Sequence, residues 1–139
     1  MPVSTPEMNA FVDDYMSVCC ERDVVRIAEM SVDDENGGFF GVHSGASRDE
    51  AVADTIAKLR FAPRAHCHNS KTKGYYVGDF AWFLSLWDGE CPDGFVVPIR
   101  GTTAMRKVDG QWKVCSFHVS EAVDRSEHMK AASPKDAHK

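Results

Sequence analysis

Residues 100–120 read RGTTAMRKVDGQWKVCSFHVS, and this stretch decides the fold. Two runs with β-forming side chains flank the dipeptide Asp109-Gly110. An Asp-Gly pair between two such runs favours the tight turn of a β-hairpin. We therefore expect strands over residues 95–107 and 111–120, paired antiparallel.

Two more strands are expected earlier in the chain, over residues 64–70 and 75–87, where the apolar period is two. Residues 88–90, Asp-Gly-Glu, are expected to form a turn after the second of them. Asp79 follows Gly78 and is expected to shape the turn into its strand.

The first third of the chain has helical patterning instead. Capping boxes at Ser4-x-x-Glu7 and Ser47-x-x-Glu50 predict two helix starts, and Asp23 can cap a shorter helix between them. The expected buried face of the first helix comprises Met8, Phe11, Val12, Tyr15, Met16 and Cys19, and that of the second comprises Val24, Ile27, Ala28 and Met30. The expected buried face of the third helix comprises Val52, Thr55, Ile56 and Leu59. Pro63 is expected to end this third helix.

Helices followed by an antiparallel meander predict an α+β fold, with the helices on one face of a curved sheet. Residues 1–121 are expected to form a single domain. Residues 122–139 lack apolar periodicity and are expected to be a tail, partly helical or disordered.

Composition narrows the class of protein. The formal net charge of −5 over 139 residues, with scattered Lys and Arg, argues against a nucleic-acid groove. The N-terminal residues do not resemble a secretory signal, and no apolar run approaches the roughly 18 residues of a membrane span. Five cysteines, two of them adjacent, favour free thiols in a reducing compartment, so we expect a cytoplasmic protein without membrane contact.

Three stretches make the chain resemble the nuclear-transport-factor-2-like superfamily, and within it the SnoaL-like and ketosteroid-isomerase-like domains. They are residues 78–83 (GDFAWF), residues 100–113 with their Asp109-Gly110 turn, and residues 116–120 (SFHVS). The resemblance covers most of residues 5–120. It implies a cone: a strongly curved, mostly antiparallel sheet wrapped around the N-terminal helices, with an internal pocket.

Many relatives form homodimers through the outer face of the sheet. An exposed second face would be costly for a chain with three tryptophans, so we expect a homodimer of this kind. The other expected partner is a small apolar or weakly acidic molecule in the pocket.

Alternation along each strand predicts which side chains face that pocket. On the last strand the inward set is Cys115, Phe117 and Val119, whereas His118 points outward. The same count places inward Ala81, Phe83, Ser85, Trp87, Arg100, Thr102 and Ala104. The expected ligand-binding set is Tyr15, Phe40, Phe83, Trp87, Arg100, Thr102, Cys115, Phe117 and Val119.

Arg100 is the expected polar anchor, because a buried guanidinium needs a carboxylate partner or an anionic ligand. The alternatives are that Arg100 pairs with a local acid or lies at the rim. Tyr15 stands where isomerase-like members place a tyrosine that donates to an oxyanion, although a purely structural core tyrosine is the stronger interpretation.

The catalytic residues of the relatives are not in place, so the catalytic set is unknown. Phe39 or Phe40 stands where the resemblance places the isomerase base, and Thr102 stands near its second acid. No aspartate matches the polyketide cyclases, and Arg100 lacks the flanking acids of the epoxide-hydrolase relay. Cys115 could be a nucleophile only with a histidine on its own face.

His66 and His68 share one side of a strand, and His43 or His118 could complete a metal site with them. Only two ligands are local, so an exposed polar edge is favoured and no metal or cofactor is expected. Two hypotheses about function remain. The first is a small-molecule-binding protein with an apolar pocket; the alternative is a non-catalytic homo-oligomeric assembly module with a vestigial cavity, or an isomerase or hydrolase using an unusual base such as His66 or His43.

Overall fold

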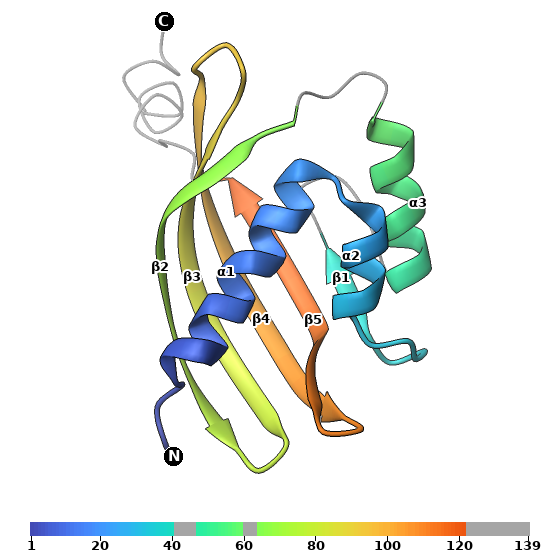
Figure 1. Ribbon diagram of the computed structural model, residues 1–139, viewed down its shortest axis with the longest axis vertical. Helices are drawn as coiled ribbons and strands as arrows, with labels where there is room; N and C mark the ends of the chain where they lie inside the picture. Colours follow the sequence, from blue (N-terminus) through green and yellow to red (C-terminus); the bar gives the residue numbers. More distant parts are fainter. Residues whose placement is uncertain (41–46, 60–63, 122–139) are drawn as a thin grey trace, which may run out of the picture.

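The computed structural model describes residues 1–40, 47–59 and 64–121. Within these residues, three helices and five strands follow one another (Figure 1). Their bounds are α1 (Pro6–Glu21), α2 (Val24–Met30), β1 (Gly38–Phe40), α3 (Arg48–Lys58), β2 (His66–Val77), β3 (Phe80–Glu90), β4 (Val96–Val108) and β5 (Gln111–Glu121). The predicted tail lies outside the described residues.

The strands form one sheet in the order β1-β5-β4-β3-β2. β1 runs parallel to β5, and every other neighbouring pair is antiparallel. Figure 1 shows the sheet curving around α1, which crosses its concave face obliquely, with α2 and α3 beside β1. The expected α+β class, with helices on one face of a curved sheet, is therefore confirmed, and the sheet is open rather than closed.

The helix starts follow their capping residues. Asp23 caps α2 and accepts from the backbone N–H of Arg26, and Ser47 with Glu50 forms the expected capping box of α3. In α1 the cap is Thr5 rather than Ser4, and it accepts from the N–H of Met8. Thr5 fits because it places Pro6 at the first helical position, where a missing N–H costs nothing.

The predicted buried face of α1 is confirmed for Met8, Val12, Tyr15 and Met16. The expected face of α3 is wrong at its C-terminal end. Ile56 and Leu59 are exposed, and α3 ends at Lys58, five residues before Pro63. Lys58 pairs there with Asp54, and both of these side chains are less exposed than Ile56.

Two strand boundaries were predicted wrongly. β2 continues to Val77, and Gly78 (φ +55°) forms the turn into β3, so residues 75–77 belong to the strand before the turn. Residues 88–90, expected to be a turn, extend β3 and pair with β2. The predicted β4–β5 hairpin is confirmed: Asp109 and Gly110 both have positive φ (52° and 78°), as a primed turn requires.

The core lies between α1 and the concave face. Ala81, Phe83, Ser85 and Trp87 of β3 are buried, as the alternation predicted, and they face Met105 and Thr103 on β4. The side chains between them are exposed on the outer face, where nothing in the described chain covers them. Among the described helices, none has the length and apolar character needed to cross a bilayer.

Candidate functional site

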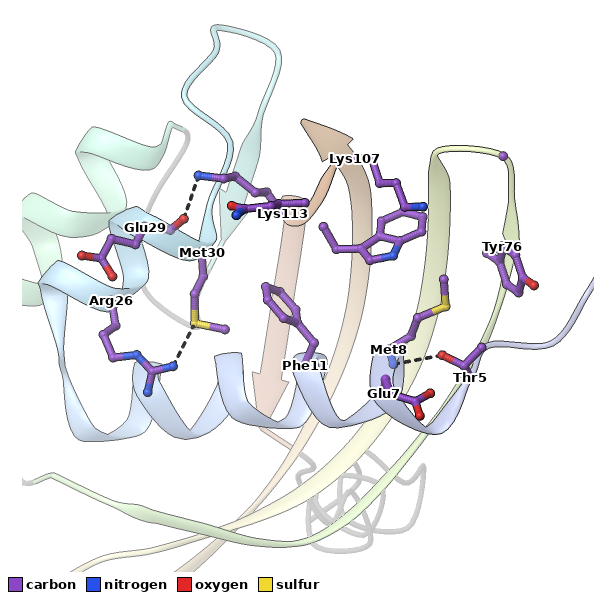
Figure 2. Close-up of a pocket in the computed structure, with 13 residues that line it drawn as sticks. Thr5, Glu7, Met8, Phe11, Arg26, Glu29, Met30, Tyr76, Lys107 and Lys113 are labelled. Carbon is purple, nitrogen blue, oxygen red and sulfur yellow. Dashed lines mark hydrogen bonds between the residues drawn. The ribbon is translucent and has the colours of Figure 1, made fainter. Parts of the chain in front are cut away.

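A groove of about 750 Å³ opens between α1, α2 and the end of the β4–β5 hairpin. Figure 2 shows Met8 and Phe11 on the side of α1 that faces this space, with Met30 reaching toward it from α2. The groove is lined by Thr5, Glu7, Met8, Phe11, Arg26, Glu29, Met30, Tyr76, Gly78, Lys107, Gln111, Trp112 and Lys113.

The hairpin turn brings the aromatic and cationic parts of the groove together. Lys107 lies two residues before Asp109 and Trp112 two residues after Gly110, so the two are opposite each other across the strands. Lys107 Nζ is 5.2 Å from the centroid of the Trp112 ring, a cation–π distance. This pair combines a flat apolar surface with a positive charge.

The two other basic side chains of the groove, Arg26 and Lys113, have partners. The Arg26 guanidinium donates to Asp14 Oδ2 at 2.9 Å. Lys113 Nζ donates to the backbone oxygen of Glu29 at 3.0 Å (Figure 2). Lys107 is the cation held against an aromatic ring instead. The groove can therefore accept a flat apolar body beside one ammonium group.

The predicted pocket residues of the cone interior come together, but they fill the space with their own side chains. Tyr15 and Phe117 meet edge to face with ring centroids 4.8 Å apart, and the Trp87 ring lies 6.5 Å from Phe117. All three side chains are buried, as is Phe83. Val119 packs half-buried against this cluster. They form a core rather than the wall of an open pocket.

The Tyr15 hydroxyl makes a hydrogen bond inside this core. Ser31 donates its only proton to the backbone oxygen of Ile27 at 2.5 Å, so Tyr15 is the donor in its 2.9 Å bond to Ser31 Oγ. Burial raises the pKa of Tyr15, and the nearby Cys19 adds to that shift. The phenol is thus a neutral donor already committed to Ser31, which favours its structural interpretation.

Asp13 accepts the hydrogen bonds of a second, partly buried polar network, which the sequence did not suggest. Its Oδ1 accepts from Trp87 Nε1 at 2.9 Å and from Thr72 Oγ1 at 2.6 Å. Because Thr72 donates its only hydroxyl proton to Asp13, Ser85 must be the donor in the 2.7 Å hydrogen bond between the Ser85 and Thr72 hydroxyls. The available signal was Trp87 itself, since a buried indole N–H needs an acceptor.

The predicted orientation of Arg100, Thr102 and Ala104 is wrong. Arg100 is opposite Leu86, which is exposed, and the inward positions of β4 are Ile99, Gly101, Thr103 and Met105. Gly101 explains the error, because it has no side chain to reveal its face. A Cβ there would lie 2.6 Å from Trp87 Cζ3, so the Trp87 ring needs a glycine at this position.

A β-bulge alters the expected alternation of β5. Ala104 is opposite Ser116, whereas Met105 is opposite Val114, which leaves Cys115 unmatched and half-buried. Before the bulge Val114, rather than Cys115, is the buried residue. Beyond it Phe117 points inward and His118 is exposed on the other side, as expected. The side chain of Phe40 and all of His43 lie outside the described residues.

The histidines of β2 are placed as predicted but do not gather a third ligand. The His66 and His68 rings stack with centroids 5.7 Å apart, and His68 Nε2 is 3.1 Å from Glu90 Oε2. Within the part of the chain that the structure describes, no three His, Cys, Asp or Glu side chains converge to hold a metal.

Comparison with known proteins shows which known fold the chain has. No known protein family matches the sequence, and no curated protein does. A protein of unknown function from Pseudomonas putida KT2440, described as nuclear-transport-factor-2-like, superposes with a TM-score of 0.67 at 18% identity, over 87% of this chain and 88% of the other. The fold is nuclear-transport-factor-2-like.

Two further solved structures have this fold. A ketosteroid isomerase-like protein from Erwinia carotovora atroseptica gives a TM-score of 0.60 at 14% identity, over 83% of this chain and 93% of the other. A protein from Thiobacillus denitrificans, provisionally named a calcium/calmodulin-dependent protein kinase type II association domain, gives 0.71 at 16% identity, over 88% and 99%. At these identities the likeness concerns the fold and leaves activity to be argued from the site.

Proposed function

We propose that this protein binds a small, mainly apolar molecule with an anionic group, and holds it in the groove beside the β4–β5 hairpin. The observation that carries this proposal is the contact of Lys107 with the Trp112 ring, next to Met8, Phe11 and Met30. The anchor is thus a lysine at the mouth of the cone, not Arg100.

The chemistry of the groove favours a flat body with a carboxylate. Apolar area removed from water stabilises a complex by about 25 cal/mol per Å², and the partly buried Trp112 and Phe11 offer such a surface. Lys107 supplies a charge for the anion, partly shielded from water by the ring beneath it. Binding is then expected to weaken as salt screens this charge.

Calorimetric titration with naphthalene-2-carboxylate, and with naphthalene-2-methanol as its neutral analogue, tests the proposal. The carboxylate should bind more tightly, and Lys107→Met should weaken its binding by about tenfold, the usual value of one well-placed charge contact. Lys73→Met, on the outer face, is the matched control and should change nothing. Absence of carboxylate binding, or equal effects of the two variants, would contradict the proposal.

A second candidate function is homo-oligomeric assembly through the outer face of the sheet. Six large apolar side chains of β2 and β3 are exposed there by 40–59%: Tyr75, Val77, Phe80, Trp82, Leu84 and Leu86. Tyr75 and Trp82 stack at 6.2 Å and form the centre of this apolar surface. The filled interior and the name of the Thiobacillus denitrificans protein support the same candidate.

An exposed apolar surface of this kind is costly in water and fits the same surface of a second copy related by a two-fold axis. Light scattering should therefore give a dimer mass, and Trp82→Glu should give the monomer mass with an unchanged far-UV spectrum. Val25→Glu, on the exposed side of α2, is the control and should leave the dimer intact. A monomeric wild-type protein would rule out this candidate.

A further inference from the structure

The end of α1 and the start of β2 carry thiols that meet although they are far apart in the sequence. The backbone N–H of Ala65 donates to the oxygen of Cys20 at 3.1 Å, which fixes the two segments against each other. Cys67 follows two residues later and is opposite Gly89, a buried position of the concave face. Cys67 therefore faces α1, and its thiol lies near that of Cys20.

The backbone on the helix side is also held firmly. Arg22 ends α1 in the left-handed conformation (φ +59°), and its N–H donates to the oxygens of Cys19 and Val18. Cys20 and Cys67 are both half-buried and pack against the core, so small oxidants can reach them from solvent. Two neighbouring thiols on segments that a backbone hydrogen bond holds together need little backbone movement to form a covalent bond.

We propose that Cys20 and Cys67 are a reversible disulfide pair that closes by exchange with a low-molecular-weight disulfide such as oxidised glutathione. The Cys20 thiolate attacks one sulfur of oxidised glutathione, breaks its S–S bond and releases one glutathione thiolate. Cys67 then attacks Cys20 Sγ in the mixed disulfide and releases the second glutathione. The two protein thiols lose two electrons and two protons, and the oxidant becomes two thiols.

The electrostatics assign the order of these steps. The neighbouring Cys20 thiol raises the pKa of Cys67, and burial raises it further, so Cys67 is the poorer first nucleophile of the two. Burial raises the pKa of the neighbouring Cys19 to about 12, so Cys19 is also a poor first nucleophile.

The bond would tie α1 to β2 covalently. The oxidised chain has fewer unfolded conformations, so its melting temperature should rise by several degrees and fall back on reduction by dithiothreitol. Because α1 also carries Met8 and Phe11 of the groove, oxidation fixes the helix that forms one wall of the candidate site.

The test incubates the purified full chain with oxidised glutathione, blocks remaining thiols by alkylation and maps the peptides by mass spectrometry. A peptide pair joined through Cys20 and Cys67, lighter by two hydrogens and lost on reduction, is expected. Cys20→Ser should remove the cross-link and its melting shift, whereas the control Cys115→Ser on β5 should keep both. A Cys19–Cys67 linkage, or a persistent glutathione adduct without the cross-link, would overturn the proposal. The peptide map of the wild-type protein tests the linkage even where a variant folds poorly.

Discussion

The two faces of β3 differ in what covers them, although their composition is similar. On the concave face Phe83, Ser85 and Trp87 are buried against α1, and their polar atoms are satisfied by Asp13 and Thr72. On the outer face Trp82, Leu84 and Leu86 are exposed. A strand that is apolar on both sides is typical of one that is covered on both sides. The comparison teaches that the described chain covers one face of its sheet and leaves the other exposed, which is the surface that the proposed dimer would use.

The largest expected effect separates the two faces directly. Trp87→Ala should lower the free energy of unfolding by about 3–5 kcal/mol, because it empties a packed site and leaves the oxygen of Asp13 without its indole donor. Trp82→Ala, on the outer face, should cost the isolated monomer less than about 1 kcal/mol. Urea denaturation at low protein concentration measures both, and equal losses would contradict the assignment of the faces.

A pair of neighbouring aspartates on α1 sharpens the comparison. Asp13→Asn should cost about 1–3 kcal/mol of unfolding free energy, since Asp13 accepts two hydrogen bonds from the concave face. Asp14→Asn should cost at most about 0.5 kcal/mol, because its ion pair with Arg26 is half-exposed. The same denaturation series measures the two, and a larger loss for Asp14→Asn would show that the polar network contributes little.

Alkaline pH should weaken the concave side through its buried acids. The folded-state pKa of Cys19 is raised from 9.0 to about 12, and burial raises that of Tyr15 as well. Both groups are neutral when protonated, so their contribution is fully present below about pH 9 and is lost as pH rises from there to about 12. Urea unfolding under reducing conditions should show this decline, and Cys19→Ala should flatten it whereas the control Tyr75→Phe should not.

The smallest expected effect concerns Arg100. Because Arg100 lies on the outer face, Arg100→Ala should leave naphthalene-2-carboxylate binding within about twofold of wild type and the unfolding free energy within about 0.5 kcal/mol. Calorimetry and denaturation measure these values. A tenfold loss of affinity for naphthalene-2-carboxylate in Arg100→Ala would show that Arg100 binds the carboxylate and would exclude the groove as the main binding site.

The order of elements and most of the core were predictable from sequence, because capping residues, helical spacing and the Asp109-Gly110 turn are local signals. Several errors arose where the local sequence does not indicate which face of a strand a residue occupies or where the strand ends. Gly101 has no side chain to mark its face, and the bulge at Cys115 shifts an alternation that is otherwise regular. The boundary at Gly78 was missed because apolar residues continue on both sides of the turn.

The candidate site was harder to predict than the fold. The aromatic residues Tyr15, Phe83, Trp87 and Phe117 were correctly brought together, but whether they leave a space depends on how their rings interdigitate in three dimensions. The groove combines parts from α1, α2 and a hairpin, and its Lys107–Trp112 pair is visible in sequence only once the hairpin register is known.

The tryptophans report on the outer face, the core and the groove separately, which gives the most direct test of the central claim. In a ¹⁵N-labelled protein, titration with naphthalene-2-carboxylate should shift the indole N–H signal of Trp112 saturably and leave those of Trp82 and Trp87 in place. Trp112→Phe assigns the signal. A saturable shift of Trp82 alone, or no shift of any indole up to millimolar ligand, would contradict binding in the groove.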